Sequence, residues 1–365
     1  MNAPHLYVHL PFCASRCGYC DFVTVVGHAD AHGRYVDAVV RELELERDHL
    51  AVPLDSVYLG GGTPTLLAPA ALERLLAALP RSAELTVEAN PETVTAELAA
   101  QLARNGVDRV SIGAQTFHMH LLDVLGRRAQ PDDVRRAVHR LRDAGIGNIS
   151  LDLIYGIPGQ EPAHLARDLD EALALEPEHL SAYELEAKPG TRFTHAYGQE
   201  LERQAEALEG YFEHVVGTLT GAGYRWYETA NFCRAGDRDL RARHNLGYWL
   251  GHDYLGLGVG AVSTIENRRW RNAPSLHRYL DALERGEQQP RETECLTADV
   301  RATERVMLGL RLDEPLPLAG LEHAVDGREL DRLVAAGIAT SGGGAIALTR
   351  RGRFLGGGAT ARLLA

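Results

Sequence analysis

Three cysteines near the start of the chain have the residue type and spacing needed to bind iron. They stand in Cys13-Ala-Ser-Arg-Cys17-Gly-Tyr-Cys20, directly after Pro11-Phe12. Three thiolates at this spacing can hold three irons of a [4Fe–4S] cluster and leave the fourth iron without a protein ligand. An open iron of this kind can bind a small molecule. The spacing therefore predicts a metal cluster with an exchangeable ligand position.

Two other interpretations of these cysteines stay open at this point. A structural zinc ion usually has four protein ligands, and Asp21 or His9 could supply the fourth. Offsets of four and seven residues also place three side chains on one face of a helix without any metal. The motifs described next favour the iron cluster. We interpret Cys233 and Cys295 as buried thiols without a role.

A glycine-rich segment follows the second predicted strand and reads Gly60-Gly61-Gly62-Thr63-Pro64-Thr65. Glycine has no Cβ, so its backbone can approach a ligand closely and its N–H groups can meet a carboxylate. Glu88 ends the third predicted strand and could accept hydrogen bonds from a ribose. A tight turn and a solvated carboxylate are the ordinary alternatives for these two features.

Polar side chains recur at the ends of the later predicted strands. Gln115 follows the fourth strand, and Asp152 lies on the fifth, within Leu151-Asp-Leu-Ile-Tyr-Gly-Ile-Pro-Gly-Gln160. In a β/α barrel, polar residues at the carboxyl ends of the strands face the site. The recurrence predicts that these side chains meet at one edge of a sheet.

The elements that must position these residues are short apolar strands that alternate with helices. We expect strands at 6–10, 56–59, 85–88, 110–113, 149–153 and 180–185, and helices at 34–50, 69–79, 95–105, 131–144 and 161–175. In the helix at 131–144, Val134, Val138 and Leu141 share one face and Gly145 follows the end. Six such units, without an obvious seventh and eighth, predict an α/β fold whose parallel sheet curves into a partial, TIM-like (β/α)6 barrel.

The pattern changes after Glu186. We expect a helix at 204–219 and then an irregular stretch, rich in glycine and aromatic residues, at 224–271. Further along, two helices and a hairpin predict a small helical, winged-helix-like domain, with these elements at 303–312, 327–336 and 338–348. We divide the chain into a barrel core, an irregular segment and a C-terminal domain, at 1–232, 233–290 and 291–365.

Composition and charge exclude several classes of function. The 365 residues are 45% hydrophobic, which is enough for a sizeable core, and their formal net charge is −12. An acidic surface repels phosphate backbones, so we do not expect nucleic acid as a partner. No apolar run approaches the ~20 residues that span a bilayer, and the first ten residues do not have the pattern of a signal peptide. Five cysteines, three of them crowded together, are a poor disulfide framework, so we expect a cytoplasmic protein.

These segments resemble, in order, the sequence blocks of the HemN/HemW family of radical S-adenosylmethionine (SAM) proteins. The resemblance covers nearly the whole chain, with blocks at 6–13, 60–65, 88–91, 109–115, 126–127, 152–160, 256–262 and 310–312. It implies a radical SAM barrel with a C-terminal HemN-type domain. It also implies a SAM molecule on the open iron, whose sulfonium bond would be cleaved to an adenosyl radical by one electron from the cluster.

The resemblance also implies roles for individual residues. The ligands of the cluster would be Cys13, Cys17 and Cys20. The residues in contact with the cluster-bound SAM would be Tyr7, Gly61, Glu88 and Val262. The residues that match positions around a second SAM in the enzyme branch of the family are Tyr19, Gly62, Thr63, Gln115, Arg127 and Asp152. Whether one or two SAM molecules bind stays open.

Two features are closer to the haem chaperones of this family than to its coproporphyrinogen dehydrogenases. The dehydrogenase pattern has a further cysteine shortly after the third and a longer arm before the first. Here Cys20 is followed by Asp21-Phe22, and only twelve residues precede Cys13. The second feature is His244-Asn245-Leu-Gly-Tyr248-Trp249, which resembles the HNxxYW signature of the chaperones.

This signature suggests a haem site. An imidazole can ligate haem iron, and the family match favours this role for His244 over that of an ordinary hydrogen-bonded histidine. The rings of Tyr248 and Trp249 could lie against a porphyrin face. The nearby guanidinium groups could meet haem propionates, but we interpret them as part of a solvated basic loop; they belong to Arg268, Arg269 and Arg271.

The resemblance implies a protein that binds haem and transfers it to acceptor proteins, with the cluster and SAM in support and an electron donor as a further partner. One alternative is an oxygen-independent enzyme that oxidatively decarboxylates coproporphyrinogen III. Another is a HemN-like radical SAM methyltransferase with a different substrate. Formation of deoxyadenosine coupled to loss of a substrate would indicate an enzyme, whereas stable haem binding with transfer would indicate a chaperone.

Overall fold

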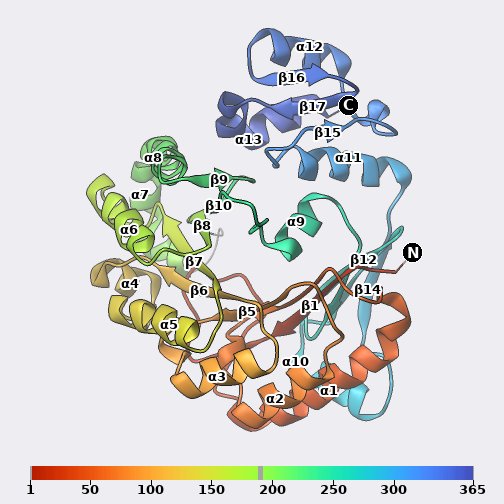
Figure 1. The fold of residues 1–365 in the computed structure, drawn as a ribbon. Coiled ribbons are helices and arrows are strands. Elements are labelled where there is room, and N and C mark those ends of the chain that lie inside the picture. The colour runs from red at the N-terminus through yellow and green to blue at the C-terminus, as the bar shows by residue number, and fades with distance from the viewer. Residues whose placement is uncertain (1, 188–191, 365) are drawn as a thin grey trace.

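Six parallel strands form the centre of the fold. The computed structural model describes residues 2–187 and 192–364. The central strands are neighbours in sequence order, each parallel to the next (Figure 1): β1 (His5–Leu10), β4 (Ser56–Gly61), β5 (Leu85–Ala89), β6 (Arg109–Gln115), β7 (Asn148–Tyr155) and β8 (His179–Glu184). They are the six strands that the sequence predicts. The α/β class and the parallel sheet are therefore confirmed.

The helices that connect these strands lie along the outside of the curved sheet (Figure 1): α1 (His32–Glu46), α2 (Pro69–Ala78), α3 (Ala96–Arg104), α4 (Met119–Leu125), α5 (Pro131–Asp143) and α6 (Pro162–Ala174). Helix α5 shows the local reason for this arrangement. The side chains of Val134, Val138 and Leu141 are buried in the main core, as their spacing predicts. Pro131 begins the helix, and Gly145, with φ 93°, follows its end.

The stretch at 224–271 is not irregular, so that expectation is wrong. Strand β11 (Tyr254–Leu257) pairs in parallel with β1 and adds a seventh parallel strand, and antiparallel strands extend the sheet beyond both edges. They are β9 (Tyr224–Trp226), β10 (Asn231–Arg234), β12 (Val262–Ile265), β13 (Arg268–Asn272) and β14 (Arg291–Cys295). Strands of three to five residues are too short to show a clear alternation in the sequence.

Four helices complete the barrel region: α7 (Arg192–Gln204), α8 (Leu208–Gly221), α9 (Arg243–Trp249) and α10 (Leu276–Glu284). The helix expected at 204–219 corresponds to α8. Short 3-10 helices lie at 29–31, 47–49, 64–66, 91–93, 205–207 and 322–324, and a small parallel pair joins β2 (Phe12–Cys13) to β3 (Val25–Val26). Helix α9 contacts β4 on one side and the C-terminal helix α11 (Ala298–Gly309) on the other.

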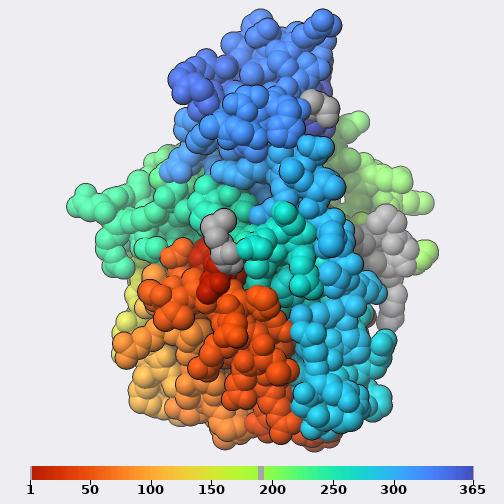
Figure 2. All heavy atoms as spheres, turned by 90° about the vertical axis from the view of Figure 1, so that its right-hand side faces the viewer, coloured from red at the N-terminus to blue at the C-terminus, as the bar shows by residue number. Residues whose placement is uncertain are grey.

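The C-terminal part has its own hydrophobic core, as expected of a small domain, and stands out at one end of the molecule (Figures 1 and 2). Besides α11 it contains β15 (Leu316–Pro317), α12 (Gly327–Ala335), β16 (Ala339–Gly342), β17 (Ala345–Leu348) and α13 (Arg350–Leu363). The hairpin expected at 338–348 is present as β16 and β17. Helix α13 was not predicted, because its run of glycines at 356–358 lowers helix propensity.

The predicted boundary after residue 232 falls within β10, and the boundary after residue 290 falls just before β14, so both neighbouring segments contribute strands to the main sheet. The three-part division of the chain remains a prediction. In residues 2–187 and 192–364, no helix is both long enough and apolar enough to cross a membrane.

Candidate cofactor site

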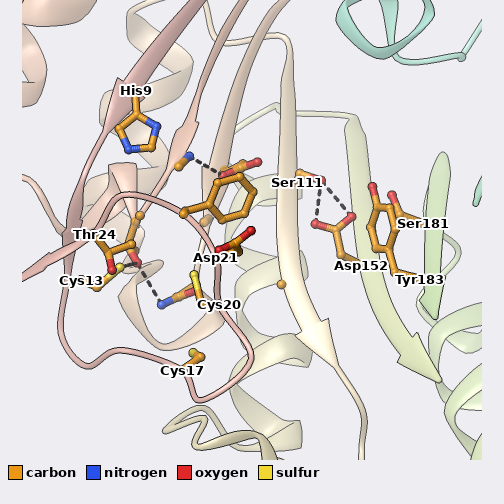
Figure 3. A pocket seen from close by; sticks show the side chains of 18 of the residues that line it. His9, Cys13, Cys17, Cys20, Asp21, Thr24, Ser111, Asp152, Ser181 and Tyr183 are labelled. Atoms are coloured by element: carbon orange, nitrogen blue, oxygen red, sulfur yellow. Dashed lines mark hydrogen bonds between the residues drawn. The ribbon is translucent and has the colours of Figure 1, made fainter. Parts of the chain in front are cut away.

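One cavity gathers the residues that the sequence analysis singled out. Its volume is about 890 Å³. It is lined by residues of the parallel strands and of the cysteine loop (Figure 3), and by residues of α9. The predicted residues that line it are Tyr7, Cys13, Cys17, Tyr19, Cys20, Gly61, Gly62, Thr63, Glu88, Gln115, Arg127, Asp152, His244, Asn245, Tyr248 and Val262. Trp249 is the one predicted site residue that is not part of this lining.

Cys13 ends β2, and Cys17 and Cys20 lie in the loop that the pairing of β2 with β3 closes at its base. The N–H of Val25 donates to the carbonyl of Pro11 at 2.8 Å, and the N–H of Cys20 donates to the carbonyl of Cys17 at 3.2 Å. All three thiols are half-buried, and burial raises the pKa of Cys13 and of Cys20. Metal binding would displace such thiol protons.

The donor set suits a cluster better than a single ion. Among the described residues, no three histidine, cysteine or acidic side chains converge on one ion position. A [4Fe–4S] cluster distributes its thiolate ligands over separate irons, so three thiols spread along one loop are compatible with it. A polar group stands near two of the sulfurs: the Thr63 hydroxyl is 4.0 Å from Sγ of Cys13, and a guanidinium nitrogen of Arg127 is 3.8 Å from Sγ of Cys17.

Asn90 connects these two polar groups, and the sequence analysis did not single it out. Its Nδ2 donates to the hydroxyl of Thr63 at 3.2 Å, and its Oδ1 accepts from Arg127 at 2.8 Å. Arg127 also donates to the carbonyl of Gly113 at 3.1 Å. The position of Asn90 directly after β5, within Glu88-Ala-Asn-Pro91, is the signal that could have identified it.

The glycine-rich segment is shaped by contacts with the end of β1. The N–H of Gly62 donates to the carbonyl of Leu10, and that of Thr63 to the carbonyl of Phe12, both at 2.8 Å. A Cβ on Gly61, where φ is 108°, would lie 2.4 Å from the ring of His9. The glycines are therefore required by packing within the chain. The backbone N–H groups of residues 61–63 all donate to acceptors within the chain. The segment therefore shapes the wall of the cavity and does not offer free N–H donors to a ligand.

Glu88 is held at the base of this segment. Its Oε1 accepts from the Tyr58 hydroxyl at 2.7 Å, and its Oε2 accepts from the N–H of Gly61 at 3.0 Å. Burial raises the pKa of Glu88 to about 7, and the nearby charge of Asp152 adds to the increase. The carboxylate can accept further hydrogen bonds, and its charge changes near neutral pH.

Asp152 lies deeper in the cavity, beside serines of neighbouring strands (Figure 3). The hydroxyl of Ser111 is 3.1 Å from each of its carboxylate oxygens. Burial raises the pKa of Asp152, while the charge of the buried Arg109 opposes that increase. Gln115 has a positive φ of 65° at the end of β6, where the register with β7 shifts. The sequence analysis did not identify Arg109 as a site residue.

At the other end of the cavity, α9 carries a buried imidazole. Nδ1 of His244 is 2.8 Å from the Ser56 hydroxyl, and its Nε2 is 3.3 Å from the Tyr248 hydroxyl. The ring stacks on that of Tyr58, with centroids 5.1 Å apart and an interplanar angle of 25°. Burial lowers the pKa of His244 to about 3, with a smaller contribution from His5. His244 is therefore a neutral imidazole at physiological pH.

The other residues of the motif at 244–249 lie in two regions, one at the cavity and one at the C-terminal domain. Nδ2 of Asn245 donates to the hydroxyl of Tyr227 at 3.2 Å. Trp249 packs instead against the C-terminal domain, where the guanidinium of Arg311 lies 4.2 Å from the centre of its ring. Its carbonyl accepts from Arg305 at 3.3 Å. The expectation that the Trp249 ring faces the same cavity as His244 does not match this geometry.

The three arginines of β13 also lie in different surroundings. Arg269 forms a two-pronged ion pair with Glu304, at 2.7 and 2.8 Å, and Arg268 lies near the ring of Trp270. Arg271 is exposed and is the one of the three that lines the cavity. The two remaining cysteines differ from one another, since Cys233 is buried, as predicted, whereas Cys295 is exposed.

Family models match both parts of the chain. Residues 7–172 match the model of the radical SAM superfamily, and residues 296–355 match that of the HemN C-terminal domain. The first match contains the three cysteines and all the candidate residues up to Asp152. Proteins of the radical SAM superfamily carry a [4Fe–4S] cluster and SAM, in agreement with the thiols and the cavity described above.

Curated relatives align over most of the chain. A protein named "Heme chaperone HemW" from Mycobacterium tuberculosis is 37% identical over 96% of this chain and 92% of its own length. Proteins of the same name are 33% identical in Bacillus subtilis, over 96% of both chains, and 35% identical in Escherichia coli, over 92% of this chain and 91% of that protein.

The fold matches a solved structure over almost the whole of this chain. Coproporphyrinogen III oxidase (HemN) from Escherichia coli superimposes with a TM-score of 0.84, over 99% of this chain and 90% of that one. The sequence identity is 24%, so this likeness describes the fold. It supports the radical SAM type of barrel with a C-terminal domain.

Proposed function

We propose that this chain, which belongs to the HemN/HemW family of radical SAM proteins, binds haem and delivers it to acceptor proteins. The three relatives named as haem chaperones, each aligned with more than nine tenths of the chain, support this proposal. The observation that carries it is the neutral imidazole of His244 in the wall of a cavity of about 890 Å³. A cavity of this size is suited to one ligand of the size of a porphyrin.

The surroundings of His244 suit a metal ligand. Histidines that bind metals usually hold their other ring nitrogen in a hydrogen bond, and they must be neutral. Ser56 provides that hydrogen bond at Nδ1, and burial keeps the ring neutral. Nε2, whose present partner is the Tyr248 hydroxyl, is the nitrogen available to haem iron. The neighbouring rings of Tyr58 and Tyr248 add aromatic surface beside it.

We assign the cluster and SAM to the opposite end of the same cavity. Cys13, Cys17 and Cys20 would ligate the cluster, and the cluster-bound SAM would contact Tyr7, Gly61, Glu88 and Val262. A cluster of this type supplies the electron that cleaves the sulfonium bond of SAM. The protein would hold SAM in place. Residues 61–63 are fixed by hydrogen bonds to the end of β1 and to Glu88, and the Glu88 carboxylate can accept hydrogen bonds from ribose hydroxyls.

The second set of candidate residues lines the same cavity and would take part in binding SAM or a second SAM. It consists of Tyr19, Gly62, Thr63, Gln115, Arg127 and Asp152. We place the protein in the cytoplasm, because thiolate ligands of a cluster persist in a reducing compartment. Its partners would be haem, proteins that accept haem and an electron donor.

Parallel assays on the anaerobically reconstituted protein test this function. We expect haem to bind with saturation near one molecule per chain and to move to an apo-protein acceptor. We also expect no conversion of coproporphyrinogen III to protoporphyrinogen IX in the presence of SAM and an electron donor. Robust production of protoporphyrinogen under these conditions would contradict the proposal.

A pair of variants assigns the haem site. His244→Ala should weaken haem binding by about tenfold or more, or shift its absorption bands, while leaving the iron and sulfide content unchanged. Trp249→Phe is the matched control, because Trp249 is five residues further along the same helix but outside the cavity. Equal loss of haem in both variants would indicate that α9 has a structural role only.

A further inference from the structure

We propose that the surface residue His252 determines, through a row of hydrogen bonds, which ring nitrogen of His244 is free to bind haem iron. The inference rests on the proposed function and deepens it, because it concerns control of the same site. It starts from four side chains that join the wall of the cavity to the surface of the protein. Three of them are buried, namely His244, Ser56 and His5. His252, at the outer end of the row, is exposed.

Short contacts link each member of this row to the next. Nδ1 of His244 is 2.8 Å from the Ser56 hydroxyl, and the same hydroxyl is 2.8 Å from Nδ1 of His5. On the other side of the His5 ring, Nε2 is 3.1 Å from Nδ1 of His252. Each contact is within hydrogen-bond distance, so the row runs from the cavity to the surface without a break.

The elements that form the cavity wall also align the row. His5 and Ser56 are register partners in the parallel pair of β1 and β4, and His244 comes from α9, which contacts β4. Gly247 of the same helix leaves room for the imidazole of His5, because a Cβ at residue 247 would collide with that ring. The row is therefore held by strand pairing and by close packing of α9 against both strands.

The single proton of the Ser56 hydroxyl couples the two rings beside it. The hydroxyl can donate to only one of the two Nδ1 atoms, so the other Nδ1 must carry a proton and donate to the hydroxyl oxygen. A neutral imidazole carries one proton on its two nitrogens, so this choice fixes both rings. The row therefore has two arrangements of its protons, which run in opposite directions.

The two arrangements leave different nitrogens of His244 free. In the first, His244 is protonated at Nδ1, its Nε2 has a free lone pair, and Nε2–H of His5 donates to Nδ1 of His252. In the second, every donor is reversed, and His244 carries its proton on Nε2, where it faces the Tyr248 hydroxyl. Because a nitrogen that binds a metal must be unprotonated, only the first arrangement can bind iron through Nε2.

The charge of His252 decides between the arrangements. When His252 is neutral and protonated at Nε2, its Nδ1 accepts from His5, and the first arrangement is possible. When it takes up one proton from solvent, both its nitrogens carry protons, and Nδ1–H donates to Nε2 of His5. That contact imposes the second arrangement, in which His244 cannot bind iron. The change consumes one proton and moves no electrons.

His252 is also the member of the row that can change its charge between pH 5 and pH 7. Burial lowers the pKa of His5 to about 4 and that of His244 to about 3, so both rings stay largely neutral in this range. Partial burial lowers the pKa of His252 from its ordinary value. The row is therefore in reach of its iron-binding arrangement at pH 7 and loses it as the pH falls.

Charged groups of other segments face His252 and set this response. Arg305 of α11 lowers the pKa of His252 further, whereas Asp55, just before β4, and the neighbouring Asp253 oppose the decrease. Asp253 is itself paired with Arg301 of α11 at 3.0 Å. The outer end of the row thus lies where the barrel meets the C-terminal domain.

Haem titrations of the full-length, cluster-loaded protein at pH 7 and pH 5, without SAM, test the inference. We expect the wild-type affinity to fall by about threefold or more at pH 5, because the binding-competent arrangement becomes the minor one. The absorption bands of the remaining complex should shift towards those of His244→Ala. In His252→Gln, the affinity and the bands should be the same at both pH values, because a glutamine side chain takes up no proton.

Two further variants complete the test. His139→Gln is the matched control, because His139 is an exposed histidine of α5 outside the cavity, and it should keep the wild-type response. Ser56→Ala should lose the response, because it breaks the row at the hydroxyl. Glu88, whose pKa is near 7, is present in every variant, so its titration does not affect the comparison.

The possible outcomes separate this inference from the proposed function. Equal haem affinity of the wild type at pH 7 and pH 5, or a response that persists in His252→Gln, would overturn the inference and leave the chaperone function standing. An equal loss of affinity at both pH values in His252→Gln, with the response retained, would assign a structural role to His252 and would also overturn it. A protein that binds no haem at either pH would contradict both proposals.

Discussion

The two ends of the cavity are assembled in different ways. At the cluster end, side chains come from loops and ends of several parallel strands, and all the residues predicted there line the cavity. At the other end, one seven-residue helix carries the motif, and its residues divide: His244 faces the cavity, whereas Trp249 packs under Arg311. The carboxyl ends of parallel strands meet at one edge, so strand position alone brings residues together. On a helix, residues five apart face different directions.

The largest effect is expected from a substitution that removes a ligand of the cluster and leaves the haem site unchanged. Cys17→Ala takes away one of three thiolates, so we expect loss of nearly all bound iron, sulfide and visible cluster absorption after reconstitution. Haem binding should persist, because the described partners of His244 are Ser56 and the rings of Tyr58 and Tyr248 rather than the cysteines. The matched control is Cys233→Ala, which removes a buried thiol outside the cavity. Loss of the cluster in Cys233→Ala, with retention in Cys17→Ala, would refute the assignment.

A smaller effect is expected from the backbone contacts that position the cluster end. In Gly62→Ala, the new Cβ would lie 2.7 Å from the carbonyl oxygen of Phe12 and 2.8 Å from that of Leu10. Because backbone must move to relieve these contacts, we expect unfolding free energy to fall by ~1–3 kcal/mol and SAM binding to weaken. Thermal unfolding and SAM titration measure the two effects.

Gly217→Ala provides the matched control for this substitution. Gly217 lies exposed within α8, and a Cβ there would meet no atom within 4 Å. Replacing it should stabilise the helix by ~0.5–1 kcal/mol, since alanine has the higher helix propensity. A Gly62→Ala protein as stable as the wild type, with unchanged SAM affinity, would show that the close packing of residues 61–63 is not needed.

The smallest expected effect is a pH dependence confined to the cluster end. Burial raises the pKa of Glu88 to about 7, so its carboxylate is largely protonated at pH 6 and largely ionised at pH 8. An ionised carboxylate accepts stronger hydrogen bonds, and SAM affinity should therefore rise a few-fold between these values. Glu88→Gln should remove the rise. A wild-type affinity that is flat, or that falls with pH, would contradict the proposed contact.

Haem binding should not share this profile. The pKa of His244 is lowered to about 3, so its imidazole stays neutral throughout the range from pH 6 to pH 8. Its capacity to bind iron is therefore constant over that range. The pH dependence thus distinguishes the two ends of one cavity.

The sequence predicted the barrel well because periodicity and position carry most of its information. Val134, Val138 and Leu141 show a helical period. Glu88, near the end of β5, and Asp152, within β7, lie on strands whose side chains the structure brings into one cavity. The short strands after residue 224 were missed, because segments such as Tyr254–Leu257 are recognisable as strands only through pairing with distant partners. Pairing of this kind is a tertiary property that local patterns do not encode.

The same distinction applies within the site. The cysteines were identified by spacing, but Asn90, which joins Thr63 to Arg127, has no spacing signal of its own. The position of Trp249 depends on the docking of the C-terminal domain against α9, which a motif in one segment cannot express. The orientation of Trp249 was therefore beyond the reach of sequence patterns, whereas Asn90 could have been identified by its position directly after β5.

The pairing of β1 with β11 has a consequence for the order in which the protein is made. During synthesis, β1 emerges from the ribosome before the other strands of the sheet. Strand β4 follows and can pair early with one edge of β1. Its other edge waits for Tyr254–Leu257, the partners of residues 5–8, which are synthesised some two thirds of the way along the chain. Until then an apolar strand has an open edge, which favours aggregation. The strand that leads into the cysteine loop therefore completes its pairing only late in synthesis.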